Sequence, residues 1–430
     1  MDSGWQATQE YARRLDHDDP LARFREDFYR PAGTVYMDGN SLGLLSRSAE
    51  KAVLAALAAW REQAIGGWLD ADPPWFTLGE ELGRLQAALV GARPGEVVVT
   101  GSTTVNLHNL LGSFYRPKGK RRRILADELN FPSVIYALRG HLTLRGTDPQ
   151  ADLILVPSRD GRTIAEEDIA AAITEEVALV VLPSVLYRSG QLLDLPTLAR
   201  AAHERGALIG FDLSHSAGVV PHRLSSWDVD FAFWCNYKYL NGGPGCTASL
   251  YVNKRHHGTT SPGLAGWWGY RKDKQFDMRL DWEGAGDAGA WQVGTIPVLA
   301  TAAVAGALRV TLEAGVDAIR EKSMRLTEYL ISLVDCKLTG RDLGFSVGTP
   351  RDPVRRGGHI ALEHPEAVRI VKALRARGVI PDFRPPDVIR LAPVPLYCTF
   401  EDVWQTIRHL HDIVDRREHL SYTPERGTVA

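Results

Sequence analysis

The sequence predicts an α/β fold with a mostly parallel central sheet and helices on both faces, followed by a smaller α+β domain. Between residues 97 and 252, short apolar runs alternate with helical patterns, as in parallel strands joined by helical crossovers. After about residue 301 the pattern changes to longer amphipathic helices with few apolar runs. Because 430 residues exceed what one hydrophobic core usually supports, we expect more than one domain.

The large domain is expected to contain strands that are short and continuously apolar, because strands buried on both faces have no polar side. The candidate strands are residues 97–99, 124–125, 153–156, 177–182, 208–211, 229–234 and 248–252. Helical patterns lie between them. One is 195–205, where Pro196 stands near the helix start and Gly206 follows its end.

The smaller domain is expected to contain helices at 309–334 and 365–377 and strands at 359–362 and 388–392. A last helix should begin after Thr399, the expected N-cap, and run to about His419. We therefore expect three parts. Residues 1–50 pack on the small domain, residues 51–300 form the large domain, and residues 301–430 form the small domain.

Charge and cysteine content favour a cytoplasmic protein whose ligand is a small molecule. Lys and Arg number 50 against 52 Asp and Glu, which gives no overall field to attract nucleic acid or a membrane. The four cysteines are scattered without a CxxC pair, so we expect neither a disulfide framework nor a zinc site. The pair His256 and His257 lies in a polar loop and is expected at the surface, with no metal role.

The most informative stretch is FWCNYKYLNGGPG, which places Lys238 just after an expected strand. Asp212 ends the preceding strand, and strand ends of an α/β sheet face the ligand crevice. A lysine and a carboxylate there suit pyridoxal phosphate, which needs an amine and a partner for its ring nitrogen. The segment 101–104 (GSTT) precedes a helix and offers a phosphate cradle. Taken singly, Asp212 and this segment could also be plain helix N-caps.

These residues belong to a wider set of motifs, and through it the chain resembles kynureninases, pyridoxal-phosphate enzymes of the aspartate-aminotransferase fold (fold type I). The resemblance covers nearly the whole chain. The segments GNSLG and RLAPVPLY are specific to that family, whereas the Asp and Lys arrangement is common to the superfamily. The matching segments are 36–44 (YMDGNSLGL), 104–108, 131–133 (FPS), 211–216 (FDLSHS), 237–245, 266–267 and 390–397 (RLAPVPLY).

The resemblance implies a role for each matching residue. Lys238 would be the Schiff-base lysine, Asp212 would bind the pyridine nitrogen and Phe131 would stack on the ring. The remaining roles are phosphate binding by Thr103, Thr104 and Tyr237, a place in the cofactor pocket for His215, substrate-carboxylate binding by Arg390, and a substrate contact by Ser41. Trp267 and Thr295 would come from the second subunit of a homodimer. His215 could instead be an ordinary buried histidine, and Arg390 could form a structural salt bridge.

The implied reaction is hydrolysis of L-kynurenine to anthranilate and L-alanine in tryptophan catabolism, with Lys238 as base and Tyr237 as acid. Val134 departs from the family, which commonly has Asp at this position, and so leaves another aryl-keto amino acid open as substrate. Animal members that favour 3-hydroxykynurenine commonly have Asn at the position of Thr295 and a histidine near that of Trp68. Thr295 lacks the amide donor of Asn and Trp68 offers no acceptor, so we expect L-kynurenine to be preferred over 3-hydroxykynurenine.

Two other functions compete with this interpretation. A cysteine desulfurase-type β-lyase would need a cysteine on a mobile loop, and Cys398 is the only late candidate. A regulatory protein that merely binds pyridoxal phosphate or an aromatic acid would not require Lys238.

Overall fold

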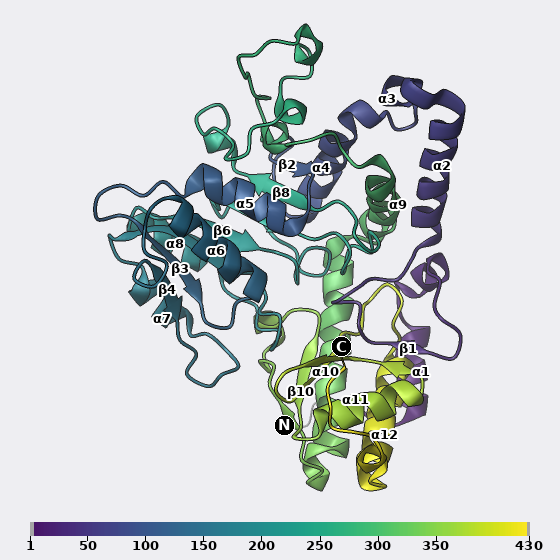
Figure 1. Cartoon of the computed structure of the whole chain (residues 1–430). Coiled ribbons are helices and arrows are strands. Elements are labelled where there is room, and N and C mark those ends of the chain that lie inside the picture. Colours follow the sequence, from purple (N-terminus) through teal and green to yellow (C-terminus); the bar gives the residue numbers. More distant parts are fainter. Residues whose placement is uncertain (1–3, 428–430) are drawn as a thin grey trace.

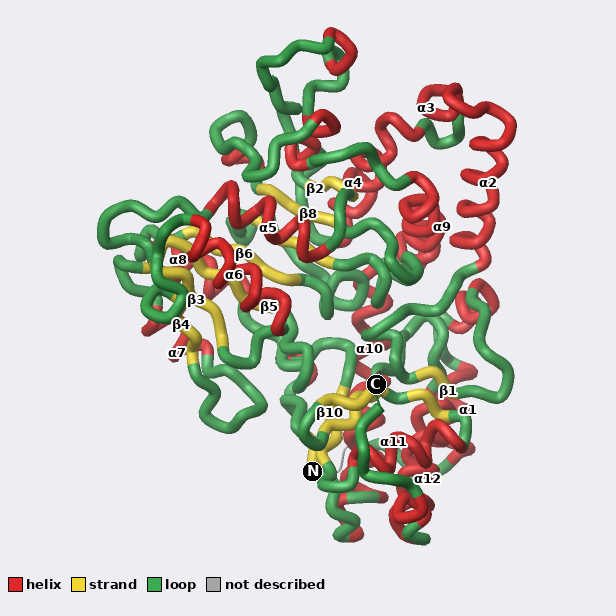
Figure 2. Tube along the Cα trace, viewed as in Figure 1, coloured by secondary structure: helices red, strands yellow, loops and turns green. Residues whose placement is uncertain are grey.

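The computed structural model describes residues 4–427, and in it two parts of the chain each have their own sheet and core. Figure 1 shows the larger α/β part above and the smaller part, with both described ends of the chain, below. Figure 2 shows that strands lie at the centre of each part and that helices and loops surround them.

The large part is built on a seven-stranded sheet in the order β2-β8-β7-β6-β5-β3-β4. Strand β8 pairs antiparallel with β2 and β7, while every other neighbouring pair is parallel. The mostly parallel sheet is therefore confirmed. The bounds are β2 (Val97–Val99), β3 (Arg123–Asp127), β4 (Leu153–Val156), β5 (Val177–Pro183), β6 (Leu208–Asp212), β7 (Phe231–Trp234) and β8 (Ser249–Val252).

Helices cover both faces of this sheet, as predicted. Successive residues of β5 enter opposite cores, since Val180 and Leu182 belong to one apolar cluster and Leu179 and Val181 to another. All four are fully buried, which explains why the strand is apolar without alternation. The helices of this part are α2 (Arg47–Gln63), α3 (Gly67–Asp70), α4 (Leu78–Leu89), α5 (Thr103–Phe114), α6 (Pro132–Leu144), α7 (Glu166–Ala172), α8 (Leu195–Glu204) and α9 (Val298–Ala314).

The small part contains an antiparallel sheet in the order β12-β13-β10-β9, packed against helices. Its last helix begins as predicted. Thr399 Oγ1 accepts a hydrogen bond from Asp402 N at 2.8 Å, and the Asp402 carboxylate accepts one from Thr399 N. The bounds are β9 (Ser346–Val347), β10 (Ile360–Glu363), β12 (Asp382–Arg384), β13 (Val388–Leu391), α10 (Val316–Lys337), α11 (Ala367–Ala376) and α12 (Phe400–Asp415).

The N-terminal segment lies against the small part. Helix α1 (Gln9–His17) packs on α12, and β1 (Val35–Tyr36) pairs in parallel with β11 (Val379–Ile380). The expected boundary at residue 300 falls inside α9, which packs along α2. The three-part division stays a prediction.

The expected continuous helix over 309–334 is wrong. Helix α9 ends at Ala314 and α10 begins at Val316, and the two axes differ by 78°. Gly315 between them has φ 78° and ψ 131°, a conformation that glycine adopts without strain. Within residues 4–427, no single helix is long and apolar enough to cross a membrane. Helices α9 and α10 reach that length and composition only when the bent pair is taken together.

Candidate functional site

A cavity of about 220 Å³ lies at the carboxyl ends of the central strands and extends to the small part. Nine of the eleven residues predicted for the site line it. They are Ser41, Thr103, Thr104, Phe131, Asp212, His215, Tyr237, Lys238 and Arg390. The remaining lining residues are Asn40, Leu107, Ser133, Val134, Pro183, Val185, Tyr187, Ser214, Phe233 and Arg384. Segments more than 300 residues apart in the sequence therefore meet in one cavity.

Asp212 and Lys238 reach the cavity from neighbouring strands. Asp212 ends β6, which pairs in parallel with β7, and Lys238 follows shortly after β7. Burial raises the pKa of the Asp212 carboxyl, while its hydrogen bond from Ser214 and the charge of Lys238 oppose that rise. A carboxylate held in this setting would be stabilised by a cationic ring nitrogen opposite it.

His215 lies directly beside the lysine. Lys238 Nζ donates a hydrogen bond to His215 Nε2 at 2.9 Å, and His215 Nδ1 is buried without a partner among the described residues. Burial, then the charges of Lys238 and Arg390, hold the pKa of His215 well below its usual value. The imidazole is therefore neutral and can accept from the lysine.

The start of α5 has features that suit the predicted phosphate cradle. Ser102 is the N-cap but its side chain makes no capping hydrogen bond, and Thr104 Oγ1 lies 2.8 Å from Ser133 Oγ at the start of α6. The first N–H groups of a helix have no partner within the helix, so they suit an anion. Gly101 has φ 54°, which lets the chain turn tightly into α5.

One wall of the cavity is apolar. Phe131 is 47% exposed and meets Tyr187 edge to face at 5.4 Å. Such an uncovered ring is available to stack on a flat ligand. Val134 is buried and lines the cavity. It contributes contact area but no charge to this wall.

Arg390 is buried yet reaches the cavity from β13. It donates from Nε to Asp382 Oδ2 at 2.5 Å, from Nη1 to Tyr187 O at 2.6 Å and from Nη2 to Ser41 Oγ at 3.0 Å. Arg390 therefore forms a structural salt bridge with Asp382, and it also lines the cavity.

Sequence reasoning missed several lining residues. Asn40 is fully buried, and neither its amide oxygen nor its amide nitrogen has a partner among the described residues. Its place beside Ser41 in GNSLG was a usable signal. Arg384 and Tyr187 gave no such signal, because only the folded chain brings them to the cavity.

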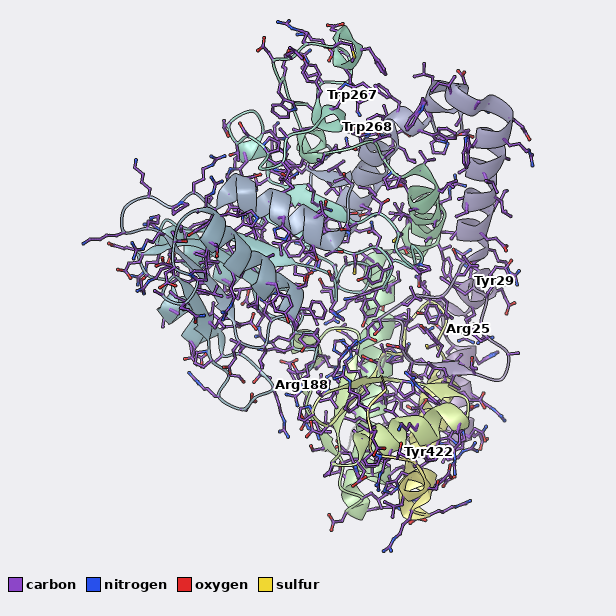
Figure 3. All side chains as sticks on the ribbon, in the orientation of Figure 1. Arg25, Tyr29, Arg188, Trp267, Trp268 and Tyr422 are labelled. Atoms are coloured by element: carbon purple, nitrogen blue, oxygen red, sulfur yellow. The ribbon has the colours of Figure 1, made fainter. Side chains whose placement is uncertain are left out.

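Trp267 and Thr295 are not brought to this cavity. Trp267 is 45% exposed, and Thr295 is also exposed. Figure 3 shows Trp267 beside Trp268 on the segment that projects from the large part, far from Tyr422 in the small part. Their predicted roles depend on a second copy of the chain and stay predictions.

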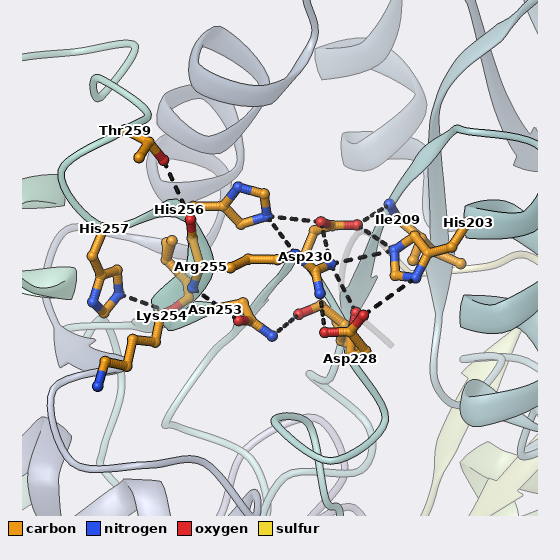
Figure 4. Close-up of polar contacts among 12 residues, drawn as sticks. His203, Ile209, Asp228, Asp230, Asn253, Lys254, Arg255, His256, His257 and Thr259 are labelled. Atoms are coloured by element: carbon orange, nitrogen blue, oxygen red, sulfur yellow. Dashed lines mark hydrogen bonds and ion pairs between the residues drawn. The ribbon is translucent and has the colours of Figure 1, made fainter.

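The expectation that His256 lies at the surface is wrong. Its side chain is only 13% exposed, and Nε2 lies 2.7 Å from Asp230 Oδ1 (Figure 4). Asp230 immediately precedes β7 and is fully buried. It also contacts His203 and Arg255. In the described part of the chain, no group of three or more His, Cys, Asp and Glu side chains could hold a metal ion.

Cys398 is not placed to carry sulfur. Its side chain is buried, its Sγ donates to Tyr36 O at 3.2 Å, and burial raises the pKa of the thiol. It does not line the cavity. A buried protonated thiol is a poor nucleophile, which argues against the β-lyase alternative.

Comparison with known proteins gives full-length relatives. Residues 80–343 match the aminotransferase class-V family, and residues 319–410 match the kynureninase C-terminal domain. The chain is 55% identical over 423 residues to a protein named kynureninase from Geobacillus thermodenitrificans, covering 98% of each chain. It is 54% identical over 426 residues to another of that name from Bacillus thuringiensis, covering 99% of each.

Solved structures with the same fold are more distant in sequence. A cystine C-S lyase, C-DES, superposes with a TM-score of 0.77 at 18% identity, covering 90% of this chain and 99% of that one. The cysteine desulfurase CsdA from Escherichia coli gives 0.76 at 19% identity, covering 93% and 98%. At this identity the similarity shows the fold alone.

Proposed function

Because this chain belongs to the kynureninase family, we propose that it hydrolyses L-kynurenine to anthranilate and L-alanine with pyridoxal phosphate as cofactor. The observation that carries the proposal is the cavity. It collects Lys238, Asp212 and Arg390 with the start of α5 in one enclosed space. A binding protein would need no lysine at that point, whereas the chemistry of this cofactor requires one.

The residues present fit the cofactor. Asp212 would hold the ring nitrogen, Phe131 would cover one ring face, and Thr103, Thr104 and the start of α5 would hold the phosphate. His215 is neutral and accepts a hydrogen bond from Lys238. It would line the pocket beside the cofactor ring. When bound, pyridoxal phosphate supplies an electron sink that makes the Cβ–Cγ bond of the substrate breakable.

Proton transfer would be shared by adjacent residues. Lys238 would take the proton from the α-carbon of the substrate, and Tyr237 would deliver a proton to the β-carbon released by cleavage. Burial raises the pKa of the Tyr237 phenol, so it stays protonated at neutral pH and can act as the acid. One water is consumed, and its oxygen ends in the carboxylate of anthranilate.

The exact substrate is less constrained by the sequence. Val134 lines the cavity without a charge, so the second acidic group that the family commonly has near the cofactor is missing. The preference for L-kynurenine over 3-hydroxykynurenine stays a prediction, since Thr295 and Trp68 lie outside this cavity. A cytoplasmic location and a catabolic role also stay predictions from sequence and family.

A homodimer is part of the proposal. Trp267 lies close to other exposed apolar side chains in the sequence, including Phe276, Met278 and Leu280, and such surface is typical of subunit interfaces. Helix α2 lies at the outer edge of the molecule (Figure 1) and exposes Trp60. Burial of these side chains against a second copy would allow Trp267 and Thr295 to reach the site of that copy.

The direct test is to add L-kynurenine to the purified, cofactor-loaded protein and to follow anthranilate by its fluorescence and L-alanine by amino-acid analysis. Equal amounts of both products are expected. Release of an aryl carboxylate from a related aryl-keto amino acid, but not from L-kynurenine, would assign a different substrate. Inactivity toward both would contradict the proposal.

A further inference from the structure

Arg390 has little capacity left for a ligand. A guanidinium carries five N–H donors, one on Nε and two on each Nη. Asp382 takes the Nε donor, Tyr187 O takes one Nη1 donor, and Ser41 Oγ and a close Asp382 contact occupy Nη2. One Nη1 donor remains. The bidentate grip on a carboxylate needs two parallel donors, so Arg390 in this arrangement cannot provide it alone.

Arg384 is the other arginine in the cavity. It lies on β12, and β12 pairs antiparallel with β13, which carries Arg390. Its Nε lies 3.0 Å from Asp382 Oδ2 without hydrogen-bond geometry, and neither Nη donates a hydrogen bond to any residue within 4–427. The side chain is 29% exposed. Its guanidinium end is therefore held by one carboxylate and still open to a ligand.

The charged side chains that line the cavity also favour an anionic ligand. Three of the lining side chains are cationic, namely Lys238, Arg384 and Arg390, and Asp212 is the one carboxylate among them. Asp212 lies at the cofactor end, where the charge of Lys238 opposes the rise in its pKa caused by burial. The two arginines share Asp382, which lies behind them and does not line the cavity. Asp38 also acts on both guanidinium groups, but neither carboxyl lines the cavity, so at the substrate end the cavity wall itself presents only cationic side chains.

We infer that Arg384 is a second substrate-binding residue, which donates to the α-carboxylate of the substrate together with the remaining Nη1 donor of Arg390. Asp382 holds the two guanidinium groups on either side of one carboxylate site. The inference rests on the proposed function for the identity of the substrate. It adds a specificity: the site selects amino acids with a free α-carboxylate over their amides.

The test compares ligands that differ only in that group. L-Alanine and L-alaninamide would be titrated into wild type, Arg384→Lys and Arg384→Gln, with the absorbance of the bound cofactor as the binding signal. Arg384→Gln should weaken L-alanine binding about 10–100-fold, as expected for loss of a charged hydrogen bond, and leave L-alaninamide unchanged. Arg384→Lys keeps the charge but loses the paired guanidinium donors, so its affinity for L-alanine should lie between those of wild type and Arg384→Gln. KM for L-kynurenine should rise in parallel.

Arg341→Gln is the matched control, because Arg341 is exposed and has no ion pair among the described residues. It should bind both ligands as wild type does. Equal weakening of L-alanine and L-alaninamide in Arg384→Gln, or loss of cofactor and thermal stability with the ligand ratio unchanged, would overturn the inference. Because this ratio requires no turnover, failure of wild type to release anthranilate would contradict the proposed function separately.

Discussion

At the scale of single residues, Lys238 differs from the other lysines near it in the sequence by its surroundings. Its Nζ faces a neutral imidazole inside a cavity, whereas Lys272 lies over the Trp268 ring at 4.0 Å. We predict that borohydride reduction of the loaded protein will leave the cofactor on the peptide that contains Lys238. Peptide mapping by mass spectrometry checks this. Label on Lys254 or Lys272 would refute the assignment, and Lys238→Arg should take up no label.

The residues that could be predicted from sequence are those whose role follows from local context. Asp212 ends an apolar strand and Lys238 follows the next one, so strand order alone brings them together. Arg384 could not be found in this way, because its place depends on the register of β12 against β13. Tyr187 contributes its backbone oxygen to Arg390, and no side-chain pattern reveals that.

At the scale of elements, the Asp230 network fixes the start of β7, the strand that leads to Lys238 (Figure 4). Burial alone would raise the pKa of Asp230, but hydrogen bonds from His203 and His256 and the charge of Arg255 lower it well below its usual value. We predict that Asp230→Asn will lower the free energy of unfolding by about 1–3 kcal/mol, because it removes a buried acceptor and leaves Arg255, which is 32% exposed, paired only with Asp228. Urea denaturation measures this.

The matched control is Asp228→Asn, since Asp228 pairs with the same Arg255 but is 64% exposed. Its effect should stay below about 1 kcal/mol. The pH dependence has a definite sign. Because the folded pKa of Asp230 lies below the unfolded one, its stabilisation is complete above the ordinary Asp pKa and is lost as pH falls toward the folded value. Equal losses in both variants would contradict this account.

The break between α9 and α10 is the clearest failure of sequence reasoning at this scale. The apolar pattern continues across Gly315, so periodicity alone predicts one helix, and the backbone conformation of a single glycine decides otherwise. The strands were predictable because burial on both faces leaves continuous apolar runs, as in β5.

We predict that Gly315→Ala will lower the free energy of unfolding by about 1–3 kcal/mol. A Cβ there would meet no atom within 4 Å, so the cost comes from the positive φ of 78° alone. Gly140 lies inside α6, and a Cβ there would also meet no atom within 4 Å. It is the control, because its substitution should change stability in the opposite direction. Gly140→Ala should stabilise by about 0.5–1 kcal/mol through helix propensity. Chemical denaturation of both variants is the measurement, and destabilisation by both would argue against a backbone origin.

At the scale of the whole molecule, one chain contains both parts and the cavity between them, but two of the residues predicted for the site lie outside that cavity. Nine predicted residues line the cavity, while Trp267 and Thr295 lie on outer surfaces. Only the family resemblance led us to expect this separation, because a residue supplied to another copy would have the same local sequence context as one used within its own chain. The arrangement therefore makes a prediction about pairs of subunits.

Co-expressed Lys238→Ala and Trp267→Ala subunits should regain activity that neither variant has alone. In a mixed dimer, the Trp267→Ala subunit keeps Lys238 and receives an intact Trp267 from its partner, so one of the two sites is complete. With random pairing, half of the dimers are mixed, and recovery should approach about a quarter of the wild-type activity. The control pairs Lys238→Ala with Asp212→Asn. Both residues serve the cavity of their own chain, so each mixed site keeps one defect and activity should stay absent. Recovery in the control, or none in the test pair, would show that Trp267 is not supplied by the second subunit.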